Sequence, residues 1–95
     1  MGSSDSAAVR VTLWRLPDGQ RQEATTHGPN GRTLEVELAS AESASELAPG
    51  ALVEIEDPER VYLGEVEDRR GNRLRIVVEH FLEQREIARI REIWR

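Results

Sequence analysis

The sequence has no cysteine and no lysine, and only four of its 95 residues are aromatic: two Trp, one Tyr and one Phe. Without cysteine the chain has no disulfide framework, no thiolate nucleophile and no sulfur ligand for a metal. With so few aromatic side chains, its hydrophobic core has to be mostly aliphatic. No stretch approaches the roughly 18 apolar residues of a membrane-spanning helix, and no charged segment followed by an apolar core indicates a secretory signal. These absences predict a soluble, cytoplasmic protein.

The chain is acidic, although every basic residue is arginine. Thirteen Arg are opposed by eighteen Asp and Glu, which gives a net charge of −5 at pH 7. Because non-specific nucleic-acid binding depends on neutralising phosphates, this balance disfavours such a function. Arginine suits bidentate or stacked contacts with carboxylate, phosphate or guanine, but a GC-rich genome also favours it over lysine.

The length fits one domain. Residues 1–8 are small, polar and without periodicity, so we expect a disordered N-terminal leader there and a single domain over residues 9–95.

Three short runs rich in Val, Leu and Ile decide the fold class: residues 51–57, 61–68 and 73–80. Turn-forming residues separate them, with the spacing of an antiparallel meander. Gly64, inside the second run, marks a bulge or a close approach of two backbones.

Further strands are predicted before these runs. Residues 9–16 and 32–38 alternate apolar and polar side chains, as half-buried strands do. Residues 20–27 are polar and predict a weak strand at a sheet edge, and Gly-Pro-Asn-Gly at residues 28–31 is the strongest turn signal in the chain. The fold class is therefore predicted to be mainly β: a small six-stranded antiparallel β-barrel with a C-terminal α-helix.

Residues 39–49 are mostly small, with a single leucine, Leu47. We expect a long connection across the barrel end, anchored by Leu47. A ligand-binding loop is the alternative, because loops on rigid scaffolds often carry function.

Residues 83–94 predict an amphipathic helix. Its apolar side chains recur at spacings typical of one helix face: Ile87, Ile90, Ile93 and Trp94. A helix this short is marginal in water, so this face has to be packed against something. We favour a lid over the open barrel end; the alternative is a surface for a partner protein or for self-association.

No enzymatic motif is present. The chain lacks a Gly-rich phosphate loop, HExxH and GxSxG. His27 and His80 have no partners at metal-ligand spacing, so no metal site is expected. Carboxylate pairs such as Glu54 and Glu56 share a strand face, but a solvated face explains them better than a catalytic dyad. We predict no enzyme and no required cofactor.

The order of elements resembles the PilZ domain family. The resemblance is carried by residues 36–44, 47–55, 63–66 and 75–82, and it covers about two thirds of the chain. It implies a six-stranded β-barrel with a C-terminal helix, a bacterial regulatory role, and in many members binding of the second messenger cyclic di-GMP.

The two ligand motifs of that family are largely missing here. The N-terminal arginines of this chain, Arg10, Arg15, Arg21 and Arg32, are never spaced as RxxxR, the family motif that precedes the barrel. Of the family motif (D/N)xSxxG only the serine is matched, as Ser40.

The leading hypothesis is therefore a non-enzymatic regulatory adaptor of PilZ-like fold that acts through protein–protein interaction. The first alternative is a receptor that holds cyclic di-GMP through Arg10, Arg15, Arg21 and Ser40. The second is an SH3-like or OB-like nucleic-acid-binding barrel, which the acidic charge and scarce aromatics disfavour. No membrane association is expected.

Overall fold

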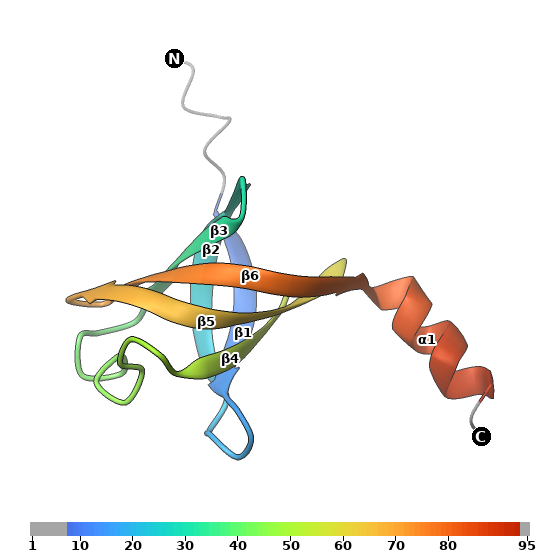
Figure 1. Cartoon of the computed structure of the whole chain (residues 1–95), viewed down its shortest axis with the longest axis horizontal. Coiled ribbons are helices and arrows are strands. Elements are labelled where there is room, and N and C mark those ends of the chain that lie inside the picture. Colours follow the sequence, from blue (N-terminus) through green and yellow to red (C-terminus); the bar gives the residue numbers. More distant parts are fainter. Residues whose placement is uncertain (1–7, 94–95) are drawn as a thin grey trace.

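Six antiparallel strands close into a barrel in the computed structural model, which describes residues 8–93 (Figure 1). In chain order the elements are β1 (Val9–Arg15), β2 (Gln22–Asn30), β3 (Thr33–Leu38), β4 (Leu52–Glu56), β5 (Arg60–Arg70), β6 (Arg73–Glu83) and α1 (Gln84–Ile93). The predicted six-stranded antiparallel barrel with one C-terminal helix is confirmed. Most of the expected leader (residues 1–7) and Trp94 lie outside the described residues.

Two three-stranded meanders, β1–β2–β3 and β4–β5–β6, form the barrel. Around the barrel the order is β1-β2-β3-β6-β5-β4, so the meanders join where β3 pairs with β6 and where β4 pairs with β1. The prediction that β2 lies at a sheet edge is wrong, because β1 and β3 flank it. Its two inward side chains, Ala24 and Thr26, are small but buried, and that is why its sequence looks polar.

The core is mostly aliphatic and receives side chains from every strand. Its members are Val11, Leu13, Ala24, Leu34, Val36, Leu38, Ala44, Leu47, Val53, Ile55, Tyr62, Val66, Leu74 and Ile76. Leu47 is buried, which confirms its predicted role as the anchor of the connection between β3 and β4. Ala44 is buried beside it in the core cluster, so this connection closes the barrel with two side chains.

Gly64 lies at a close approach of β5 and β6. The register of the two strands shifts between Leu63 and Gly64, which confirms the predicted bulge. A Cβ atom at Gly64 would lie 2.8 Å from Cγ2 of Ile76 and closer still to the carbonyl oxygen of Val77. Only glycine fits between these strands without displacing a neighbour.

The predicted turn at residues 28–31 lies mostly inside β2. The strand continues to Asn30 with a register shift after Thr26, and the chain turns at Gly31, which has a φ of 66°. The buried hydroxyl of Thr26 donates to the carbonyl of Glu35 at 2.7 Å and accepts from the N–H of Gly28 at 3.2 Å. This hydroxyl satisfies the backbone groups that the bulge leaves without a ladder partner.

The C-terminal helix does not cover the barrel. In Figure 1, α1 projects from the end of β6, away from the barrel. Among the described elements, α1 contacts mainly β6. No described residue after Ile76 belongs to the buried core cluster. The expectation of a lid is wrong, because Ala44 and Leu47 belong to the core and β6 carries the helix past the end of β3, away from the barrel.

Candidate functional site

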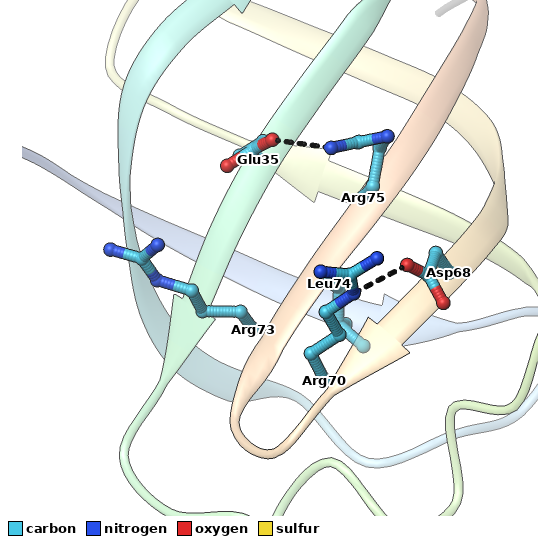
Figure 2. A pocket seen from close by; sticks show the side chains of 6 residues that line it. All are labelled: Glu35, Asp68, Arg70, Arg73, Leu74 and Arg75. Atoms are coloured by element: carbon cyan, nitrogen blue, oxygen red, sulfur yellow. Dashed lines mark hydrogen bonds and ion pairs between the residues drawn. The ribbon is translucent and has the colours of Figure 1, made fainter.

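A charged hollow of about 200 Å³ lies on the outer face of the barrel where β3, β5 and β6 meet (Figure 2). Its polar side chains come from positions that alternate with core residues, so they point outward. The lining residues are Glu35, Asp68, Arg70, Arg73, Leu74 and Arg75. Cross-strand register brings them together: Glu35 pairs with Arg75, which pairs in turn with Asp68.

Two of the three arginines in the hollow are already paired with carboxylates. Arg75 donates to Glu35 at 3.3 Å, and Arg70 donates to Asp68 at 3.1 Å. Arg73 points away from both pairs, toward β2 (Figure 2), where it lines a neighbouring small hollow with His27. Exposed pairs of this kind contribute roughly 0 to 1 kcal/mol to stability. With three arginines and two carboxylates, the hollow has one positive charge in excess. Ion pairs therefore neutralise most of the charge on this face of the barrel.

The predicted ligand residue Arg10 lies on the outer face of β1. It lines an open hollow of about 420 Å³ with Glu23, Glu37 and Asn72, among others, and none of the other predicted ligand residues belongs to that hollow. Two carboxylates beside one guanidinium disfavour a phosphate ligand there, because like charges repel.

Arg21 lies against an aromatic ring. Its guanidinium carbon is 4.6 Å from the ring centroid of Trp14, a cation–π contact. Partial burial raises the pKa of Glu54. The neighbouring carboxylate of Glu56 raises this pKa by a smaller amount, and the positive charge of Arg21 lowers it. Arg21 is therefore engaged on the β1–β4 face of the barrel.

The last two predicted ligand residues, Arg15 and Ser40, belong neither to the hollow of Arg10 nor to the contact between Arg21 and Trp14. Arg15 is exposed at the end of β1, opposite Val53 of β4. Ser40 is exposed after β3, and its hydroxyl accepts from the N–H of Ser43 at 3.1 Å in a local turn. The four predicted residues thus occupy separate surroundings, and each has a structural role or faces water.

Four of the six exposed large apolar side chains among the described residues lie on the C-terminal arm, which we define as residues 79–93; the other two are Val9 and Leu52. On the arm the exposed fractions are 54% for Phe81, 42% for Leu82, 46% for Ile90 and 76% for Ile93. Ile87 is partly buried, and Trp94, the fourth predicted interface residue, lies outside the described residues. Three of the four predicted residues therefore belong to the arm.

The arm begins as an unpaired strand edge. β6 pairs with β3 only as far as Val77, with one further bond from the N–H of Val78, whereas its pairing with β5 continues to Glu83. Residues 79–83 thus have a strand neighbour on one side only. Such edges are templates for another chain.

Hydrogen bonds fix the direction of the helix at its start. The backbone N–H of Gln84 donates to the carbonyl of Glu59 at 2.8 Å, and its side-chain amide donates to the carboxylate of Glu56 at 3.1 Å. The side chain of Glu86 accepts from the backbone N–H of Glu83 at 3.1 Å, as in a capping box. The helix therefore leaves the barrel at a set angle.

No protein family model, curated protein or solved structure matches this chain. No helix among the described residues is long and apolar enough to cross a membrane. The same residues contain no group of three or more His, Asp or Glu side chains placed to hold a metal ion.

Sequence reasoning identified the helical stripe but not the hollow or the free edge. Each arginine of the hollow occupies an ordinary outward strand position, and only the cross-strand register brings it beside its neighbours. The free edge depends on where β3 begins relative to β6, which no local pattern encodes. A usable signal was the apolar pair Phe81 and Leu82 directly after the run at residues 73–80, because together these residues are too many for a strand at 32–38 to cover.

Proposed function

We propose that this chain is a PilZ-like adaptor without enzymatic activity, which acts by binding another protein chain through its C-terminal arm. A six-stranded barrel followed by a C-terminal helix is the architecture that the sequence resemblance implies, and the chain has it. The lack of catalytic motifs in the sequence supports a binding role.

The observation that carries the proposal is the exposure of Ile90 and Ile93 on a helix that lies outside the barrel. Isolated exposed apolar residues are ordinary on protein surfaces, but a row of them on one projecting element marks an interaction surface. The hydrogen bonds of Gln84 hold this element in place before any partner binds. A pre-positioned surface loses less entropy on association.

The separate surroundings of Arg10, Arg15, Arg21 and Ser40 favour an adaptor over a cyclic di-GMP receptor. A receptor of the usual kind needs guanidinium groups that converge on phosphates and guanine. The charged hollow also gives little support to a nucleic-acid-binding barrel, since Asp68 and Glu35 neutralise two of its three arginines.

Isothermal titration of the full chain with cyclic di-GMP tests this proposal. We expect no heat beyond dilution. Micromolar or tighter binding would overturn the adaptor proposal, provided that the variant R10A/R15A/R21A loses it while keeping the same β-type circular dichroism. The variant E35Q/D68N is the matched control, because it alters charge on another face of the barrel.

A further inference from the structure

The outer face of β1, β4 and β5 carries apolar and acidic side chains next to one another. The three strands are neighbours in the barrel, and every second residue of each points away from the core. Trp14 lies opposite Glu54, which lies opposite Leu63. In the next row Leu52, which is 52% exposed, lies opposite Glu65. We call this surface the β4 face and define it by Trp14, Leu52, Leu63, Glu54, Glu56 and Glu65.

The three carboxylates of the β4 face have no cationic partner in the described part of the chain. None of the ion pairs found there involves Glu54, Glu56 or Glu65. The carboxylate of Glu56 accepts a hydrogen bond from the side-chain amide of Gln84 at 3.1 Å, but this neutral donor leaves the charge uncompensated. Burial and then the charge of Glu56 raise the pKa of Glu54, so the ionised carboxylate destabilises the fold. A bound cation would offset this effect.

The spacing of these carboxylates suits separate cationic side chains better than one bound ion. Glu54 and Glu56 are two positions apart on β4, which corresponds to about 7 Å. Glu65 lies diagonally across from Glu54 on the neighbouring strand, at about 7–8 Å. No group of three or more His, Asp or Glu side chains in the described residues is placed to hold a metal ion. Leu52 and Leu63 lie between the carboxylates, so a matching ligand has to present both basic and apolar groups.

The chain itself shows how a guanidinium binds at the edge of this face. The guanidinium carbon of Arg21 lies 4.6 Å from the ring centroid of Trp14, and its positive charge lowers the pKa of Glu54. One arginine therefore already uses the aromatic ring and the acidic environment together. Three carboxylates against this one arginine still leave an excess of negative charge. Such an excess attracts further cations.

We propose that the β4 face binds a segment of a partner protein that presents arginine or lysine together with apolar side chains. The basic groups contact Glu54, Glu56 and Glu65, and the apolar groups pack on Leu52 and Leu63. Charge complementarity selects this partner, because an acidic segment or a nucleic acid would bring like charges together. The β4 face lies apart from the apolar stripe of α1 and adds a second binding site to the proposed function. The affinity should fall as the salt concentration rises.

Fluorescence anisotropy with labelled eight-residue peptides tests the proposal on the full chain. A peptide of alternating arginine and leucine is the probe; one of alternating arginine and serine has the same charge, and one of alternating glutamate and leucine has the opposite charge. We expect the arginine–leucine peptide to bind at least five times more tightly than the arginine–serine peptide, and the glutamate–leucine peptide not to bind. Equal affinity for the two basic peptides, or no binding of the arginine–leucine peptide up to 1 mM at 150 mM salt, would overturn the proposal.

Charge-matched variants locate the site. E54Q/E56Q/E65Q should weaken binding of the arginine–leucine peptide at least tenfold. The control E23Q/E37Q/E42Q removes three exposed carboxylates elsewhere, so it has the same net charge and should bind like the parent chain. An equal loss in both variants would mean that the peptide responds to net charge alone, which would refute the site.

Single apolar substitutions separate the β4 face from other exposed apolar residues. Leu52→Asn should weaken binding of the arginine–leucine peptide at least threefold, whereas Val9→Asn, at another exposed position of the barrel, should not change it. Ile90→Ser should also bind like the parent chain; a loss in that variant instead of Leu52→Asn would assign the peptide to α1 and overturn the proposal. Circular dichroism of each variant confirms that the barrel is intact. None of these results bears on the cyclic di-GMP titration, so the two proposals fail separately.

Discussion

Gly64 is the position where a single added methyl group should affect the barrel most. In Gly64→Ala the new Cβ would overlap the carbonyl oxygen of Val77 and lie 2.8 Å from Cγ2 of Ile76. The backbone oxygen belongs to the β5–β6 ladder and cannot rotate away, unlike a flexible side chain. We therefore expect a loss of about 3 kcal/mol in the free energy of unfolding, at the upper end of the usual range for overpacking.

Thermal unfolding followed by circular dichroism measures this loss. For a domain of this size, about 3 kcal/mol corresponds to a decrease in Tm of roughly 12–24 °C. The control is Gly31→Ala, where φ is 66° and no heavy atom lies within 4 Å of the added Cβ. That substitution tests backbone strain alone and should cost about 1 kcal/mol. If Gly64→Ala unfolds no earlier than Gly31→Ala, the close approach of β5 and β6 is refuted.

Four further predictions concern stability. Leu47→Ala should lower the free energy of unfolding by about 2–5 kcal/mol in urea denaturation, because the side chain is 1% exposed in the core. Thr26→Val should cost about 1–3 kcal/mol in the same assay, since it leaves the carbonyl of Glu35 without its hydroxyl partner. Glu54 has a pKa raised above its ordinary value of 4.5 by burial and then by a neighbouring carboxylate. Its ionisation therefore destabilises the fold as the pH rises above that value, so Glu54→Gln should raise the Tm at pH 7 and leave it unchanged below pH 4.5. A chain without α1 should keep its barrel, with a Tm within about 5 °C of the parent by circular dichroism, because the helix contributes nothing to the core.

The strands were predictable because their information is local. Alternation of apolar and polar residues identified β1 and β3, and turn residues separated the last three strands. Gly64 was predicted as a special position for the same reason, since a glycine weakens a strand interior and usually occurs there at a bulge or a close backbone approach. Leu47, the single leucine among the small residues 39–49, predicted the anchor of the connection between β3 and β4.

The remaining features depend on contacts between distant residues. β2 looked like an edge because Ala24 and Thr26 are small, but closure of the barrel gives every strand two neighbours in the ring. Ala44 was missed because an alanine among serines has no apolar signal of its own. The helix was expected to be a lid because its stripe is apolar. An apolar stripe predicts that the helix packs against another surface, but not whether that surface belongs to the same molecule.

Under the proposed function, stability and binding depend on different parts of this chain. The buried core ends at Ile76, with Val78 packed against it, while the exposed apolar residues of the arm begin at Phe81. From Glu79 to Glu83 the strand is held by β5 alone. A substitution at Ile90 can therefore change association without a cost to the barrel, and one at Leu47 can weaken the barrel without changing the apolar face of α1. Because the hydrogen bonds of Gln84 set the helix direction from the barrel side, the two parts are still linked in geometry. Loss of the Gln84 contacts should therefore weaken association through orientation alone, although this residue lies outside the apolar stripe.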